Sequence, residues 1–197
     1  MTMIFLYLLF AHFVADFLLQ PRVLIRWKHE SWIGTAYHIG VHFVASLVVL
    51  LPFMPNLGVL FAILLIIAAH FLIDLIKLFF EERADKFLLT FLVDQAAHIV
   101  SLALGAFLIK DVALNLHSDG MIISFFYWVY TDFAFIVGAC LLLLITYVYE
   151  LMVFQLYRKK NTVFKPNYKS MAGRVIIWGV LYGLYLILSA YKIVALG

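Results

Sequence analysis

The sequence predicts an all-α integral membrane protein with about six transmembrane helices, the first four of which form a duplicated four-helix bundle. Hydrophobic residues make up 66% of the 197 residues and charged residues only 13%, far from the average of soluble domains. Apolar runs are long enough to cross a bilayer. A phrase with histidine and aspartate four residues apart occurs twice inside these runs, as His12–Asp16 and His70–Asp74.

Six apolar stretches are separated by breaks at Gln20-Pro21, 52–56, 81–86 and 115–120, which are rich in proline, charged or turn-forming residues. The predicted spans are Ile4–Gln20, Trp32–Met54, Leu57–Phe80, Phe87–Ile109, Phe133–Tyr157 and Val175–Leu196. The aromatic segment Met121–Asp132 is more typical of a helix at the membrane surface. Because the N-terminus lacks a basic segment and a small-residue cleavage site, we expect the first span to be retained.

Lysine and arginine residues gather in the connections after the first, third and fifth predicted spans. They are Arg22, Arg26, Lys28, Arg83, Lys86, Arg158, Lys159, Lys160, Lys165, Lys169 and Arg174. The opposite side has little beyond Lys110 and Lys192. Basic loops favour the cytoplasm, so we expect both termini to lie outside it. We expect a multi-pass protein of the bacterial inner (cytoplasmic) membrane, in contact with membrane lipids.

Two domains are predicted, a duplicated four-helix membrane domain at 1–110 and a surface segment with two further spans at 111–197. The net charge of +3 comes from loop residues, so it indicates no nucleic-acid partner. The single cysteine, Cys140, excludes an intrachain disulfide and a thiolate metal cluster. Gly179 and Gly183 in the last span form a pattern that homo-oligomers use, although close helix packing also produces it.

Each of the first four spans carries one polar face, because residues four apart share a helix face. The faces contain His12, Asp16 and Gln20; Thr35, His38 and His42; His70, Asp74 and Lys77; and Asp94, Gln95 and His98. Polar faces cannot point at lipid, so the four helices should turn them inward. The repeat predicts a pseudo-two-fold axis along the membrane normal. The copies differ, since His42 matches Leu102 and Asp94 matches Gly34.

Imidazole and carboxylate groups from facing helices are typical of bundles that hold one or two divalent metal ions. The predicted ligands are His12, Asp16, His38, His42, His70, Asp74 and His98. Asp16 and Asp74 are interpreted as ligands or as partners that orient the imidazoles. The ligand chemistry favours zinc, iron or manganese over calcium or magnesium alone.

The first functional hypothesis is a membrane-embedded metal-dependent hydrolase that acts from the cytoplasmic face. A metal would lower the pKa of a bound water to about 7. Asp94 is the candidate general base, because it has no counterpart in the first repeat, and Gln95 and Lys77 complete the predicted catalytic set. The predicted substrate-binding residues are Gln20, Arg22 and Arg26. A lipid or isoprenoid phosphate or ester would suit a pocket in the cytoplasmic leaflet, with Arg83 adding positive charge.

Three alternatives use the same residues differently. Intramembrane polar groups can simply hold helices together. A transporter or channel for metal ions or protons could use the cluster as a relay, but the polar faces thin out beyond His42 and Ser101, and a pathway must cross the membrane. Haem ligation by paired histidines has no use for carboxylates one turn away.

Three motifs resemble a bacterial membrane family catalogued only as a domain of unknown function. They are the phrase from His12 to Pro21, the phrase from His70 through Asp74 to Lys77, and Asp94-Gln95-x-x-His98. The resemblance covers about residues 4–108. More loosely, the arrangement is similar to small bacterial inner-membrane proteins described as metal-dependent hydrolases, which implies hydrolysis by analogy alone.

Overall fold

The structure, a computed structural model, describes residues 2–81, 87–115, 121–159, 162 and 164–196. The described residues form helices and contain no β-strand, so the predicted all-α class is confirmed. Arg83, Lys86 and Lys160, on which part of the orientation prediction depends, lie outside the described residues. The chain forms two compact units, Met1–Cys140 and Leu141–Gly197. The functional division predicted at 110 stays a prediction.

Among the residues that the structure describes, five helical stretches are long and apolar enough to span a membrane, and a bent pair at the N-terminus makes up to six. They include α3 (Trp32–Val49), α4 (Leu57–Glu81), α5 (Phe87–Leu108), the stretch Phe133–Tyr157, and α9 (Tyr168–Leu196). Helix α3 ends five residues before the predicted Met54 because Pro52 has no N–H to continue it, and a short 3₁₀ turn, η2 (Leu51–Phe53), follows.

The first span breaks in a way that the sequence analysis did not predict. Helix α1 (Thr2–Phe13) continues into a π-helical turn, η1 (Val14–Leu18), and the chain then bends by 90° into α2 (Arg22–Glu30). Pro21 is the N-cap residue of α2 and disfavours helical geometry in the residue before it. The sequence predicts only a connection at these residues, but they form a regular helix. The helix is short and carries Arg22, Arg26, Lys28 and Glu30.

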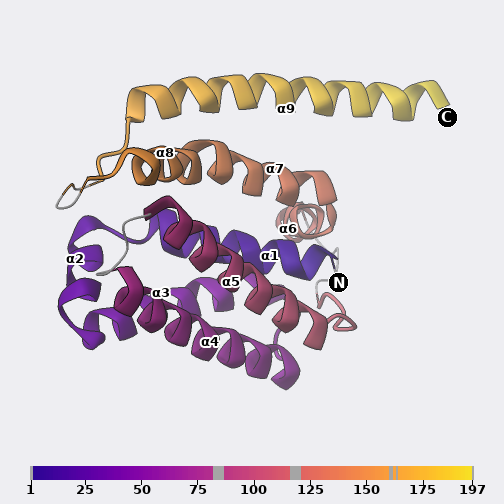
Figure 1. Cartoon of the computed structure of the whole chain (residues 1–197). Coiled ribbons are helices and arrows are strands. Elements are labelled where there is room, and N and C mark those ends of the chain that lie inside the picture. The colour runs from indigo at the N-terminus through magenta and orange to yellow at the C-terminus, as the bar shows by residue number, and fades with distance from the viewer. Residues whose placement is uncertain (1, 82–86, 116–120, 160–161, 163, 197) are drawn as a thin grey trace. The chain divides into compact units, whose positions relative to one another are not determined.

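Within the first unit, α1, α3, α4 and α5 form a ring in which each helix contacts the next and α5 contacts α1 (Figure 1). Helix α1 is therefore diagonal to α4, and α3 is diagonal to α5. This order is the one that a two-span repeat would produce, but the internal duplication itself stays a prediction.

The ring has two halves with different chemistry. The apolar half is built from Ile4, Tyr7, Leu8, Leu50, Phe53, Val59, Ala62, Ile63, Ile66, Leu102, Ala106, Ile109 and Ile136. The polar half, toward α2, holds His12, Asp16, Lys28, His38, His42, His70, Asp74, Lys77, Asp94 and His98. In the apolar half the Ile66 side chain of α4 packs directly against the backbone of α5, since a Cβ on Gly105 would overlap it.

Helix α6 (Met121–Thr131) lies at the apolar end of the ring (Figure 1). The Tyr130 hydroxyl donates to the Val49 carbonyl (2.9 Å), and the Tyr7 hydroxyl donates to the Val129 carbonyl (3.4 Å). These hydrogen bonds satisfy polar groups next to the apolar core. The two hydrogen bonds hold α6 against the apolar end of the bundle.

The second unit has its own polar contacts. Helix α7 (Phe133–Leu143) begins in the first unit, and its last residues lead into the second, where the π-helical turn η3 (Leu144–Val148) and α8 (Tyr149–Tyr157) follow. Arg174 of α9 forms an ion pair with Glu150 and lies over the ring of Tyr149. These contacts join α9 to α8 within this unit.

Candidate metal centre

All seven predicted metal ligands lie in the polar half of the ring, and their side chains face one another. His12 comes from α1 and Asp16 from η1, while α3 supplies His38 and His42. The remaining ligands come from α4 and α5 and are His70, Asp74 and His98. The five histidines are each at most 3% exposed. The sequence prediction that these residues converge is therefore consistent with the geometry, whereas their role as ligands stays a proposal.

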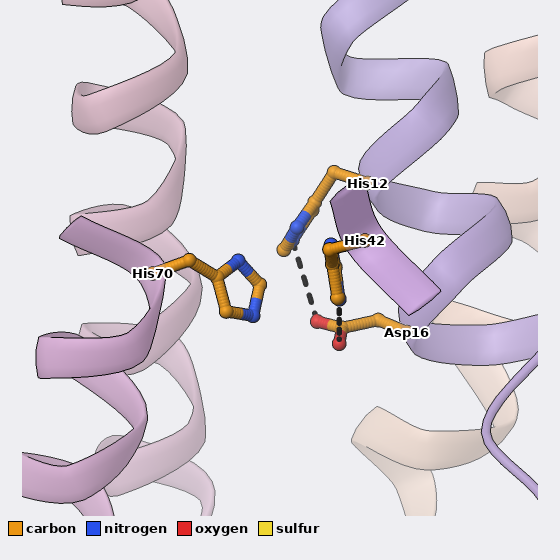
Figure 2. Close-up of side chains that lie close together, drawn as sticks. All are labelled: His12, Asp16, His42 and His70. Carbon is orange, nitrogen blue, oxygen red and sulfur yellow. Dashed lines mark hydrogen bonds and ion pairs between the residues drawn. The ribbon is translucent and has the colours of Figure 1, made fainter. Parts of the chain in front are cut away.

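The carboxylate of Asp16 is surrounded by imidazole nitrogens. Nε2 of His38 and Nε2 of His42 each lie 3.0 Å from its Oδ1, and Nε2 of His12 lies 3.4 Å from its Oδ2. Figure 2 shows His12 and His42 beside Asp16, with His70 facing them from the opposite helix. Ligand atoms on a tetrahedral ion with bonds of about 2.0–2.2 Å lie roughly 3.3–3.6 Å apart, which is close to these spacings.

Three groups of side chains each place one potential ligand atom per residue within 4.8 Å of the others. The groups are His12, Asp16, His42 and His70; His38, His70 and Asp74; and Asp74, Asp94 and His98. His70 and Asp74 each belong to two groups. The ring centroids of His42 and His70 are 3.8 Å apart, and those of His70 and His98 are 4.0 Å apart. Such dense packing of imidazoles allows one or two ions to be held.

The hydrogen-bond partners of two histidines identify which ring nitrogen is free to bind a metal. Nδ1 of His98 lies 2.8 Å from the backbone carbonyl of Asp94, which can only accept, so Nδ1 carries the proton and Nε2 has a free lone pair. Nδ1 of His38 lies 3.4 Å from the Gln20 amide. When that amide is turned so that both of its ends are satisfied, its oxygen accepts from Lys28 and lies beside Nδ1 of His38. A proton on Nδ1 would then leave the Nε2 lone pair 3.0 Å from Asp16 Oδ1, an arrangement that a cation bound to both atoms would stabilise.

Several buried polar atoms in this cluster have no hydrogen-bond partner among the described residues. They are Nδ1 of His12, Nε2 of His70, Nε2 of His98, Oδ1 of Asp94, and Nε2 of His38, which lies 3.0 Å from Asp16 Oδ1 without the geometry of a hydrogen bond. Leaving one such group unpaired costs about 1–3 kcal/mol. The concentration of free acceptor atoms around carboxylates is the electrostatic environment that a cation would stabilise.

Two lysines hold the other two carboxylates. Nζ of Lys77 donates to Oδ2 of Asp94 (2.7 Å), and Nζ of Lys28 donates to Oδ2 of Asp74 (2.8 Å). Gln95 lies beside the first pair, where its amide nitrogen donates to Asp94 Oδ2 at 3.1 Å and its oxygen lies 3.4 Å from His12 Nε2. The predicted catalytic residues Asp94, Gln95 and Lys77 are thus in contact with the cluster.

The π-helical turn η1 carries Asp16. The backbone N–H of Leu19 donates to the carbonyl of Val14, five residues back, at 2.9 Å. Such a turn inserts one extra residue into a helix and often occurs at functional sites. Here it ends α1 directly before the bend at Pro21, where the polar half begins. No sequence signal that we used distinguishes this turn from an ordinary helical one.

The predicted substrate-binding residues fall in different environments. Gln20 is half-buried, and its amide lies between the Asp16 carbonyl, Lys28 and His38. Arg22 and Arg26 are exposed on α2, on the face opposite to Leu24 and Lys28, so they point away from the cluster. Their predicted role at the surface stays a proposal.

Lys28 is the site residue that sequence reasoning missed. We had considered it only as a basic loop residue, but its side chain is 9% exposed and reaches Asp74. A signal existed, because Leu24 and Lys28 are four residues apart and share the buried face of a short amphipathic helix. Gly34 makes room for this helix, since a Cβ there would overlap the backbone of Trp27.

The chain belongs to the family described as Protein of unknown function (DUF3307), whose sequence profile matches residues 4–129. The match includes nearly the whole ring and most of α6, and so extends beyond the resemblance at 4–108. No curated protein and no solved structure matches the chain. The family match assigns no chemistry, so function has to be argued from the cluster itself.

Proposed function

We propose that this member of the DUF3307 family is a membrane-embedded metal-dependent hydrolase with its metal centre in the polar half of the ring. One observation carries the proposal: buried imidazole nitrogens without hydrogen-bond partners converge on carboxylates inside a membrane-spanning bundle. Ionisable groups at such depth are costly and are usually functional. A bound divalent ion would pair with the free nitrogens and neutralise the carboxylate charge.

Asp16 is the best candidate for the carboxylate ligand. Its oxygens lie within 3.4 Å of imidazole nitrogens from His12, His38 and His42, whereas Asp74 and Asp94 are each held by a lysine. His70 completes the group from the opposite helix. The mixture of imidazole and carboxylate suits zinc, iron or manganese. In the Asp74, Asp94 and His98 group both carboxylates already pair with lysines, so a second ion there would compete with two ammonium groups.

Asp94 is proposed as the general base. Its Oδ2 is held by Lys77 and Gln95, while its Oδ1 has no hydrogen-bond partner in the part of the chain that the structure describes and can accept a proton. A metal in this site would lower the pKa of water to about 7. Asp94 would take one proton from the attacking water, the water oxygen would bond to the ester phosphorus or carbon, and the ester bond would break. The leaving oxygen would then receive that proton, so that water and ester give an acid and an alcohol and Asp94 returns to its ionised form.

The apolar half counts against the transporter alternative. Leu8, Val59 and Ile63 are at most 1% exposed and belong to a cluster of buried hydrophobic side chains. A pathway for ions needs polar groups or water across the whole membrane. A hydrolytic site needs access from one side, and the polar half alone can provide it.

We further propose that the polar half faces the cytoplasm of a bacterial inner membrane, and that the substrate is a phosphate or ester in the cytoplasmic leaflet. The exposed Arg22 and Arg26 on α2 would attract anionic headgroups. Membrane lipids are the expected partners. Self-association through α9 at Gly179 and Gly183 also stays a proposal.

Metal analysis of the detergent-purified protein tests the metal centre. We expect near-stoichiometric transition metal in the wild-type protein and its loss in His70→Ala, because His70 belongs to two of the three ligand groups. His29→Ala is the matched control, since His29 is an exposed histidine on α2. A wild-type protein that stays folded without metal, and gains no stability when metal is added, would refute the metal centre.

Asp94→Asn separates the two functions. An amide cannot accept the proton, so we expect hydrolysis of lipid phosphates in mixed micelles to be lost while the ion held by the Asp16 group is retained. Metal or proton uptake into reconstituted vesicles is the parallel assay. Uptake by the wild-type protein that fails in Asp94→Asn, with no tested ester hydrolysed, would replace the hydrolase with a transporter.

A further inference from the structure

The polar half contains two ammonium groups that a simple metal site would not need. Lys28 donates to Asp74 at 2.8 Å, and Lys77 donates to Asp94 at 2.7 Å. Asp74 and Asp94 belong to one group with His98, whose ligand atoms lie within 4.8 Å of one another. The two lysines therefore flank the same side of the cluster, and they come from different elements, α2 and α4.

The lysine from α2 is held in place by the backbone. Helix α2 packs against the start of α3, where Gly34 has no Cβ to separate them and the Thr35 hydroxyl lies 3.5 Å from the Lys28 carbonyl. Thr35 is fully buried. The bend at Pro21 and this contact together direct Lys28 into the ring rather than toward the solvent, where a lysine side chain normally lies.

The charges of the cluster favour an anion once a metal is present. Asp16, Asp74 and Asp94 carry three negative charges and the two lysines carry two positive charges, with the histidines neutral as metal binding requires. One divalent ion would leave the site with a net positive charge. In the low dielectric of a bundle interior, that charge attracts an anion much more strongly than it would in water.

Fixed ammonium groups are also informative about what the site does not do. A site that only binds or conducts cations is weakened by two immobile positive charges next to its carboxylates, because they repel the ion. The same charges are useful if the ligand is anionic, since lysine is a common phosphate-binding residue and its hydrogen bonds to phosphate are charge-assisted.

We propose that Lys28 and Lys77 form an anion subsite that binds the phosphoryl group of a phosphate monoester next to the metal. This inference rests on the proposed function, because the excess positive charge requires a bound metal. A phosphoryl dianion matches two ammonium groups and one metal ion better than a neutral ester does. The phosphate could belong to a lipid headgroup or to a soluble phosphate ester, and the chemistry at the subsite is the same for both.

The test uses the detergent-purified protein with cobalt(II) bound in place of its own metal, so that the visible spectrum reports on ligands near the ion. Inorganic phosphate is the probe. We expect wild-type protein to change its spectrum on phosphate addition, and Lys28→Met to weaken phosphate binding by about 10–100-fold, the effect of losing one charge-assisted hydrogen bond. Cobalt stoichiometry should not change. Lys110→Met is the matched control, because Lys110 is exposed and lies over the Phe107 ring.

The variants also separate an anion subsite from a structural role. If Lys28→Met does not fold, Lys77→Met gives an independent reading at the second ammonium group, and unchanged phosphate binding in that variant refutes the subsite. Loss of cobalt together with phosphate in Lys28→Met would also refute it, since Lys28 would then support the metal site itself. Wild-type protein that binds cobalt but not phosphate overturns this inference alone, whereas absence of metal binding overturns the proposed function as well.

Competition experiments identify the source of the phosphate. Phosphatidic acid in mixed micelles and glycerol 3-phosphate in solution both carry a phosphate monoester. Stronger competition by the lipid supports a headgroup substrate, and equal competition supports a soluble one. Failure of both to compete with inorganic phosphate would overturn the assignment to phosphate monoesters.

Discussion

The two halves of the four-helix ring are built from the same helices, but one half is packed with apolar side chains and the other contains ionisable ones. In the apolar half, Leu8, Leu50, Val59 and Ile63 fill the interior, and Gly105 allows close packing against α4. In the polar half, the same helices carry histidines, aspartates and Lys77, and α2 adds Lys28. Several polar atoms of the histidines and of Asp94 have no hydrogen-bond partner among the described residues. Because lipid is as apolar as the core, packing is what stabilises the first half. The comparison indicates that stability and chemistry are separated along the bundle axis.

The largest expected effect comes from a cavity in the apolar half. Ile63 is 1% exposed, so Ile63→Ala should lower the free energy of unfolding by about 2–5 kcal/mol, and Ile63→Val by about 0.5–1.5 kcal/mol. Reversible unfolding in mixed detergent micelles measures this, and metal per folded molecule should equal that of the wild type. Loss of metal at an unchanged unfolding midpoint would show that the halves are not separate.

A substitution in the polar half should lower metal affinity without lowering the stability of the metal-free protein. His42 matches Leu102 in the predicted repeat, and its Nε2 lies 3.0 Å from Asp16. His42→Leu should lower metal affinity at least as much as loss of a supporting residue does, roughly 10–100-fold. The metal-free protein should be no less stable than metal-free wild type, because an incompletely paired polar ring is replaced by an apolar side chain.

Ser46→Ala is the control for His42→Leu, because Ser46 is the next buried polar residue along the same face of α3. It should leave metal affinity unchanged. If Ser46→Ala reduces metal binding as much as His42→Leu does, the polar half extends further along the bundle than the ligand groups indicate.

The smallest effect is expected for the substitution that tests which half of the ring faces the cytoplasm. A cysteine at position 165, introduced as Lys165→Cys in a Cys140→Ser background, should leave stability and metal content unchanged. By the distribution of basic residues, an impermeant thiol reagent should label it only after the cells are opened. Labelling in intact cells would place the polar half on the other side of the membrane.

Much of the fold could be predicted because its signals are local. Apolar length gave the spans, and α4 begins at the predicted Leu57 and ends within one residue of the predicted Phe80. The polar faces followed from a four-residue spacing, so His12, His38, His70 and His98 could be named as neighbours before the structure. The helix α2 was missed because its 9 residues are too short and too charged to give a membrane signal.

The sequence by itself determined the helical membrane class and the set of residues that must turn inward, because both depend on composition and on the helical period. Only the tertiary structure decided how that set is divided. The bend at Pro21 and the missing Cβ of Gly34 bring Lys28 to Asp74, while the π-helical turn places Asp16 among imidazoles. Whether a carboxylate pairs with a lysine, as Asp74 does, or lies among histidines, as Asp16 does, depends on contacts between segments that are distant in the sequence. No periodicity along the chain encodes such contacts.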